Sequence, residues 1–281
     1  MKAAHVLLAA AMCLCSSVLP AAEAEQGTSM SASNEELSAE REESMDWEQQ
    51  DAIRPLSAET DDSLPRVLLL GDSISLGYTP YVTDLLQGKA FVARPACNCG
   101  PSEFYLRERG NIAEWLGEER WDVIHVNFGI WDHHFINDRE DIFHFPESEL
   151  EQLKGLDPDE RVRIINSRGF HVRTTPEEYE SNLRTILADL QEHAGHVIFA
   201  LSTPVPVFEI YHKTDHIAEY NDIARKVCAE MKIPVNDLYT PALALRDDQA
   251  DGCHFSGRGY GILADAVAKR ILEVLKRDRG R

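Results

Sequence analysis

The sequence lacks a cluster of basic side chains. Its 281 residues contain 28 Lys and Arg against 48 Asp and Glu, for a formal net charge of −20. Because nucleic-acid phosphates are bound by a basic face, this composition argues against a nucleic-acid partner. No apolar run after residue 24 is long enough to cross a bilayer, so we expect no stable membrane insertion.

Cysteine is also scarce, and beyond residue 24 only four remain: Cys97, Cys99, Cys228 and Cys253. Four cysteines allow three complete pairings, and the sequence does not choose among them. A bridge from the loop of Cys97 and Cys99 to Cys253 is one possibility, and free thiols are the other. Cys228 occurs at helical spacing and is typical of a small core residue.

Compact metal-ligand spacings are absent too. His133, His134 and His144 together with Cys97 and Cys99 form none of the ligand sets of known zinc sites. Adjacent histidines on a strand would also point in opposite directions. We therefore expect no metal and no other cofactor.

The first 24 residues have the order of a secretory signal peptide. Lys2 precedes an apolar stretch from Ala3 to Leu19, and the small-residue pattern Ala22-Glu23-Ala24 follows. An uncleaved anchor is the alternative, but such a stretch is at the lower limit for spanning a bilayer. The pattern predicts cleavage near Ala24 and a periplasmic or secreted protein.

Residues 25–65 carry much of the negative charge. They contain 12 acidic and 2 basic residues, a net charge of −10, and few large apolar side chains. Such a segment cannot bury enough surface to offset the entropy lost on ordering. We predict an acidic disordered linker here.

Residues 66–281 are long enough for one domain with a full core. Short β-prone runs occur at 67–70, 91–93, 123–128, 197–201 and 233–235. Helical periodicity occurs at 80–86, 112–116, 177–190, 216–231 and 259–275. The alternation predicts an α/β fold: a three-layer α/β/α sandwich around a mostly parallel five-stranded sheet.

Two widely separated motifs indicate acyl transfer. Ser73 follows the first predicted strand within Gly71-Asp72-Ser73, and Asp251 and His254 lie three residues apart before the last predicted helix. A serine nucleophile needs a base to take its proton, and the base needs a carboxylate to orient its ring. Ligands and catalytic groups gather at the carboxyl ends of parallel strands, where Ser73 is expected.

Four ordered blocks resemble the SGNH, or GDSL, hydrolase superfamily. They are Gly-Asp-Ser at 71–73, a glycine at Gly100, Gly-Ile-Trp-Asp at 129–132, and Asp-Gly-Cys-His at 251–254. The resemblance covers residues 66–277 and implies a flavodoxin-like fold. It also implies that Ser73 is the nucleophile, His254 the general base, and Asp251 the residue that orients the imidazole.

The resemblance further implies three donors to the developing oxyanion: the backbone N–H groups of Ser73 and Gly100 and a side-chain amide from the third block. Trp131 stands where the family has Asn. Its indole N–H could donate instead. Asn127 is a second candidate, because it has the same strand parity, although it could equally satisfy neighbouring backbone groups.

A long insertion at about residues 133–175 should overhang the serine. Its aromatic and histidine residues, among them His133, His134, Phe135 and Phe143, are suited to stacking on a sugar. We expect a serine esterase that acts on small-molecule or polysaccharide esters, in particular O-acetyl groups. A lipid acyl hydrolase or thioesterase, and an inactive glycan-binding module, are the alternatives.

Overall fold

The computed structural model describes residues 63–107, 112–118, 120–144, 146–205, 216–249 and 251–279. The predicted signal peptide, residues 1–24, and residues 25–62 of the predicted linker lie outside the described residues. No helix within the described ranges combines the length and the apolar character that a membrane span requires.

A five-stranded parallel sheet forms the centre of the domain, in the order β2-β1-β3-β6-β7. Its strands are β1 (Arg66–Leu70), β2 (Phe91–Ala93), β3 (Trp121–Val126), β6 (Ala194–Ala200) and β7 (Val235–Asn236). The side chains of 67–70 in β1 are completely buried, as expected for a strand covered on both faces. The strand order is that of the flavodoxin-like doubly wound fold, so the predicted fold class is confirmed.

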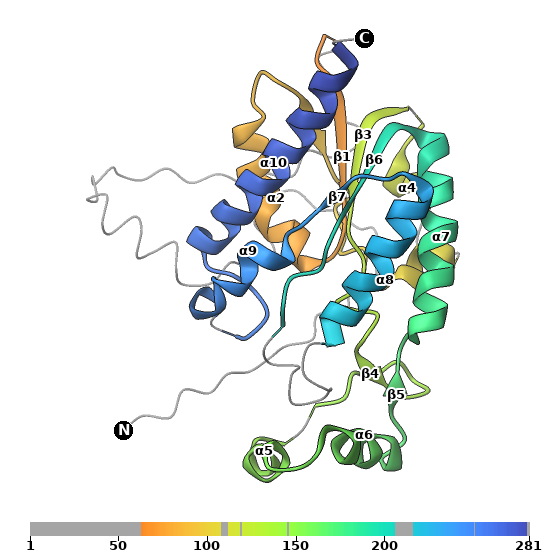
Figure 1. The fold of residues 1–281 in the computed structure, drawn as a ribbon, viewed down its shortest axis with the longest axis vertical. Coiled ribbons are helices and arrows are strands. Elements are labelled where there is room, and N and C mark those ends of the chain that lie inside the picture. The colour runs from red at the N-terminus through yellow and green to blue at the C-terminus, as the bar shows by residue number, and fades with distance from the viewer. Residues whose placement is uncertain are drawn as a thin grey trace, which may run out of the picture. The chain divides into compact units, whose positions relative to one another are not determined.

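Helices cover both faces of the sheet (Figure 1). One face packs against α2 (Ser73–Leu85), α9 (Tyr239–Leu243) and α10 (Gly257–Arg279). The other packs against α3 (Ser102–Leu106), α4 (Ile112–Leu116), α7 (Pro176–His193) and α8 (His216–Met231). In β3, Val123 joins the first core whereas Ile124 and Val126 join the second, because successive strand side chains point to opposite faces.

Two helix starts contrast in how well the sequence predicts them. The capping box at the start of α7 is present: Thr175 Oγ1 accepts the Glu178 N–H at 3.3 Å, and the Glu178 side chain accepts the Thr175 N–H at 2.9 Å. The predicted start of the first helix near Pro80 is wrong, because α2 begins at Ser73 and Pro80 lies inside it. The early start makes Ser73 the first residue of the helix.

The insertion folds into a small lobe with its own core. It contains a two-stranded antiparallel pair, β4 (Phe135–Ile136) and β5 (His171–Val172), and the helices α5 (Glu147–Lys154) and α6 (Pro158–Ser167). Phe135 and Phe143 are buried together in this core, and His133 and His134 are buried as well. These four side chains are therefore not exposed for stacking on a sugar, contrary to our expectation from the sequence.

Candidate active site

Ser73 occupies the first position of α2, directly after the turn that follows β1. Asp72 caps the helix, since its Oδ1 accepts the Ile74 N–H at 3.0 Å. Gly71 leaves no room for a side chain, because a Cβ there would lie 2.9 Å from Ser75 Oγ. The first N–H groups of a helix lack intrahelical partners and carry the positive end of the helix dipole. The serine hydroxyl therefore sits at the electropositive end of α2.

The structure brings together the three residues of the predicted triad. Ser73 Oγ lies 2.9 Å from His254 Nε2, although 181 residues separate them in the chain. On the far side of the ring, His254 Nδ1 lies 2.6 Å from Asp251 Oδ2. These distances are within the range in which a base can take a serine proton and a carboxylate can hold the base.

Asp251 is held as a carboxylate by three contacts. Its Oδ1 accepts the backbone N–H groups of Cys253 at 2.8 Å and His254 at 2.7 Å. Burial alone would raise its pKa, but the hydrogen bond from the His254 side chain and these two N–H groups outweigh burial and lower the pKa to about 2. An ionised Asp251 favours the tautomer with the proton on His254 Nδ1. That tautomer leaves the Nε2 lone pair facing Ser73.

Gln249 fastens the loop of the triad, and the sequence analysis missed it. Its Nε2 donates to the carbonyl oxygens of Cys253 and Pro204, each at 2.9 Å. The amide thus joins the Asp251–His254 loop to the segment that follows β6. A buried Gln two residues before the motif Asp was the only signal in the sequence.

Gly100 has the backbone that its predicted oxyanion role requires, but its N–H already has a partner. Its φ of +60° is in the left-handed region, and an added Cβ would meet the Phe104 ring at 2.7 Å. The Gly100 N–H donates to Asn98 Oδ1 at 2.9 Å, which forms an Asx turn. An oxyanion at this N–H would have to share it with Asn98 or displace the Asn98 side chain.

Asn127 does not fit the oxyanion role considered for it. Its Nδ2 donates to the Ala200 carbonyl at 2.7 Å and to Ser202 Oγ at 3.2 Å. Both amide hydrogens therefore serve to join the ends of β3 and β6. The side chain is buried, and its contacts agree with the alternative reading of a structural Asn at a strand end.

Trp131 lies in the loop after β3 and is half-buried. Its ring centroid is 5.2 Å from that of His134. An indole has a single N–H donor and no acceptor atom. This side chain can therefore donate a hydrogen bond to an oxyanion, and it has no acceptor that would take the other donors of the site.

Asp132 anchors the start of α3, next to the predicted oxyanion glycine. It accepts the Ser102 N–H at 3.1 Å and the Ser102 hydroxyl. Asn182 of α7 donates to the same hydroxyl at 3.0 Å. Burial raises the pKa of Asp132 to about 6, and the bonds from Ser102 oppose that rise. The last residue of the third motif thus orders the backbone that follows Gly100.

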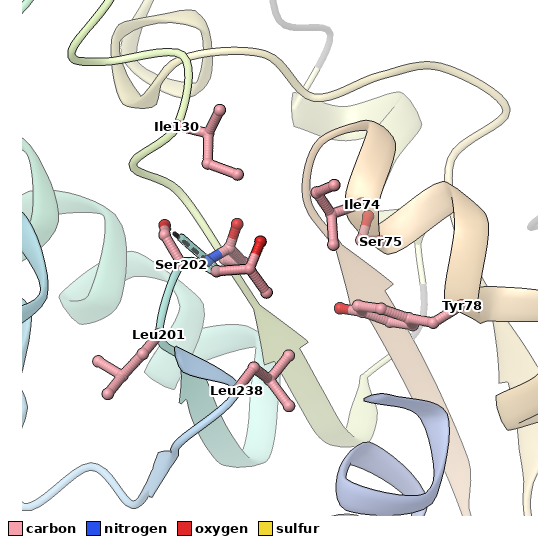
Figure 2. A pocket seen from close by; sticks show the side chains of 9 residues that line it. Ile74, Ser75, Tyr78, Ile130, Leu201, Ser202 and Leu238 are labelled. Atoms are coloured by element: carbon pink, nitrogen blue, oxygen red, sulfur yellow. Dashed lines mark hydrogen bonds between the residues drawn. The ribbon is translucent and has the colours of Figure 1, made fainter. Parts of the chain in front are cut away.

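A small cavity lies beside the first turns of α2. Figure 2 shows Ile74, Ser75 and Tyr78 of this helix facing Ser202 and Leu238 across it. Its volume is about 10 Å³. That is room for roughly one water molecule.

The described cysteines and histidines form no metal site. The structure has Cys97, Cys99, Cys228 and Cys253 as thiols, so the bridge considered from the sequence is not formed. Burial raises the pKa of Cys99 and of Cys228 to about 12, and neither is suited to act as a thiolate. No group of three His, Cys, Asp or Glu side chains within the described ranges is arranged to hold a metal ion.

Comparison with protein families shows the family to which this chain belongs. Residues 69–262 match the GDSL-like Lipase/Acylhydrolase family. The chain belongs to this family. The match spans all four motifs, from the turn of Ser73 to the loop of His254. Membership places the chain among ester hydrolases and agrees with the predicted superfamily.

Solved structures show similarity in fold at low sequence identity. A lipase/acylhydrolase from Enterococcus faecalis is 19% identical, with 74% of this chain and 95% of that chain covered and a TM-score of 0.51. Axe2, an acetylxylan esterase from Geobacillus stearothermophilus, is 16% identical, with 74% and 94% covered and a TM-score of 0.48. The acetyl xylan esterase AlAXEase is 16% identical, with 73% and 99% covered and a TM-score of 0.49. Among curated proteins, none matches this sequence significantly.

Proposed function

We propose that this ester hydrolase is a serine esterase that works through an acyl-enzyme on Ser73. The observation that carries the proposal is the unbroken series of contacts from Ser73 Oγ to His254 Nε2, at 2.9 Å, and from His254 Nδ1 to Asp251 Oδ2, at 2.6 Å. Serine, base and carboxylate in this order are the groups that acyl transfer needs.

In the proposed reaction, His254 Nε2 takes the proton of Ser73 Oγ as the oxygen attacks the ester carbonyl. The resulting imidazolium is stabilised by Asp251. The tetrahedral intermediate collapses as His254 returns the proton to the leaving alcohol, which leaves the acyl group on Ser73. A water molecule, deprotonated by His254, then attacks the acyl-enzyme. The acid departs and Ser73 recovers its proton.

The developing oxyanion would be bound by the backbone N–H groups of Ser73 and Gly100 and by the indole N–H of Trp131. Three features support this assignment: the helix end at Ser73, the left-handed backbone of Gly100, and the half-buried Trp131 at the family's Asn position. Losing one such donor typically costs about 10²- to 10³-fold in rate. Asn127 is left out because both of its amide hydrogens are occupied.

We propose a small acyl group, with acetyl as the simplest case, on a carbohydrate alcohol. The half-buried Trp131 offers a flat ring against which a sugar can pack. Relative rates on p-nitrophenyl esters from acetate to octanoate test the acyl part. Rates that rise toward octanoate would instead favour a lipid acyl hydrolase or thioesterase.

Export is a further part of the proposal, supported by the basic, apolar and A-x-A order of the first 24 residues. N-terminal sequencing of the protein from its culture fluid or periplasm should give a start near Glu25. A chain that still carries Met1 in every cell fraction contradicts cleavage.

The central test compares the wild type with Ser73→Ala on p-nitrophenyl acetate. We expect hydrolysis to fall to background in the variant, and a fluorophosphonate probe to add one covalent adduct to the wild type only. Ser167→Ala is the matched control, since this exposed serine of α6 donates only to the Ile164 carbonyl. A wild type that is no faster than Ser73→Ala would instead indicate the inactive glycan-binding module.

A further inference from the structure

Arg94 is a buried charge next to the proposed active site. It directly follows β2, and its side chain has no exposed surface. No carboxylate of the described residues lies within ion-pair distance of it, although the buried Asp72 carboxyl interacts with its charge from farther away. Its hydrogen bonds all go to neutral oxygen atoms. Burying an unpaired charge is costly unless hydrogen bonds compensate for it, so its contacts require an explanation.

The donors of Arg94 are all used. Nε donates to the Pro95 carbonyl at 3.1 Å. Nη2 donates to the carbonyl oxygens of Gly71 at 3.3 Å and Cys97 at 3.1 Å. Nη1 donates to the hydroxyls of Ser75 at 2.9 Å and Thr79 at 3.4 Å. A guanidinium has five N–H donors, and five acceptors surround this one.

These acceptors belong to two segments that meet at the proposed oxyanion site. Gly71 and Ser75 lie on either side of Ser73, and Ser75 Oγ in turn donates to the Asp72 carbonyl at 2.8 Å. Cys97 begins the loop that ends at Gly100. The Cys99 N–H donates to the same Gly71 carbonyl at 3.1 Å, so the loop is fastened to the turn both directly and through the guanidinium.

We propose that Arg94 is a positioning residue, which fixes the loop of Gly100 against the turn of Ser73 so that their N–H groups converge on one oxygen. This inference rests on the proposed function. Arg94 does not touch the substrate itself, because it is completely buried and its N–H groups are all bonded. Displacing an oxyanion donor by about 1 Å can cost roughly 10²-fold in rate. A residue that fixes two such donors relative to each other therefore has a large effect on kcat.

Substituting Arg94 by lysine or by methionine distinguishes the effect of its charge from the effect of its planar hydrogen-bonding geometry. Lysine keeps the charge but cannot reach both segments with a planar fork, and methionine keeps only the volume. For Arg94→Lys we expect kcat on p-nitrophenyl acetate to fall about 10²-fold with KM changed less than about threefold, since an oxyanion contact is made only in the transition state. Arg94→Met should lose at least as much.

Thr79→Val is the matched control. Of the five hydrogen bonds to Arg94 it removes only the longest, and it also removes the bond from Thr79 Oγ1 to the Ser75 carbonyl at 2.6 Å. Both bonds lie on the helix side, about two turns from Ser73, and we expect kcat to stay within about twofold. All rates are measured below the melting temperature of each variant. Inhibition by an alkylboronic acid, which forms an anionic tetrahedral adduct on serine, provides a second readout. Its inhibition constant should rise in Arg94→Lys in parallel with the loss of kcat.

The outcomes separate this inference from the proposed function. An inactive wild type rejects the proposed function. An active wild type with folded Arg94 variants of unchanged kcat rejects only the positioning role, as does an equal loss of kcat and rise of KM. If neither Arg94 variant folds, Ser75→Ala decides, because it removes the shortest bond to the guanidinium. We expect about a tenfold loss of kcat there, and an unchanged kcat overturns the inference.

Discussion

The proposed site has a triad half, the loop of Asp251 and His254, and an oxyanion half, the loop that ends at Gly100, and the two halves are built from different kinds of contact. Asp251 and His254 lie three residues apart in one short loop, and three hydrogen bonds within that loop hold them. The loop of Gly100 depends instead on Arg94, on the Phe104 ring and on a bond to Gly71, and no short motif contains all of these. A loop held by its own residues can be recognised in the sequence as a short motif, whereas a loop held by residues distant in sequence cannot.

The largest effect is expected in the triad half, from Asp251→Asn. The neutral amide cannot stabilise an imidazolium and no longer favours the tautomer with the proton on Nδ1. We expect kcat to fall by about 10³- to 10⁴-fold on p-nitrophenyl acetate. The exposed Asp247→Asn, four residues away, should leave kcat within about twofold. A loss of less than tenfold in Asp251→Asn would mean that another group orients His254.

Asn98 allows a sharper test of the oxyanion half, because its Oδ1 accepts the Gly100 N–H. Asn98→Asp keeps this Asx turn but puts a negative charge beside the oxyanion. At a separation of about 4 Å and an effective dielectric constant near 20, the repulsion is about 4 kcal/mol, so we expect kcat to fall on the order of 10³-fold. Asn98→Ala releases the N–H and should change kcat less than about fivefold.

The two Asn98 variants together distinguish the possible roles of that side chain. Equal activity of the wild type and Asn98→Asp would mean that the oxyanion does not form near Gly100. A 10²-fold loss in Asn98→Ala would mean that the side chain itself contributes to the reaction. The first result would move the oxyanion site away from Gly100, where the family resemblance puts it, and the second would add Asn98 to the site.

The sequence predicted the features that depend on local signals better than those that depend on distant residues. The parallel sheet followed from β-prone runs alternating with helical periodicity, and the start of α7 followed from a capping box, because both are local signals. The contact between Ser73 and His254 followed from the rule that functional groups gather at the carboxyl ends of parallel strands.

What the sequence could not predict depends on side-chain direction and on distant partners. Asn127 has the right parity for the site, yet its amide hydrogens are donated to Ala200, the last residue of β6, and to Ser202, two residues after it. The aromatic residues of the insertion suggested a substrate-binding surface. Phe135 and Phe143 are instead buried in the core of the insertion lobe, whose helices were not predicted. Arg94 follows an apolar strand, and this was the only hint of its role.

Asn127→Ala should affect stability rather than chemistry. It leaves the Ala200 carbonyl, now 2.7 Å from the Asn127 amide, without this buried donor. We expect the free energy of unfolding to fall by about 1–3 kcal/mol in denaturant titrations, with kcat of the folded variant within about threefold of the wild type. A stable variant with a 10²-fold loss of kcat would return Asn127 to the oxyanion site.

The smallest effects concern pH, and they compare a buried histidine of β3 with two buried groups that follow β3. Burial lowers the pKa of His125, in the core shared with α2 and α10, to about 3 from an ordinary value of 6.5. After β3, burial lowers the pKa of His134 to about 4 and raises that of Asp132 to about 6 from an ordinary value of 3.8. Each group contributes to the pH dependence of stability only between its pKa in the folded chain and its pKa in the unfolded chain.

Between pH 6 and pH 4 these contributions have opposite signs. As the pH falls, the unfolded chain protonates both histidines while the folded chain resists, so each removes about 1.4 kcal/mol of stability per pH unit. Asp132 is protonated earlier in the folded chain than in the unfolded chain, so it adds a similar amount. His134 and Asp132 therefore nearly cancel, which leaves His125 to set the slope contributed by these three groups.

Denaturant titrations of two variants at several pH values from 6 to 4 check this balance. His125→Gln should reduce the slope of stability against pH by about 1.4 kcal/mol per unit, and Asp132→Asn should steepen it by the same amount. The slope is the readout because each substitution also shifts the overall stability by removing hydrogen bonds. Unchanged slopes in both variants would mean that burial does not hold His125 and Asp132 away from their ordinary pKa values.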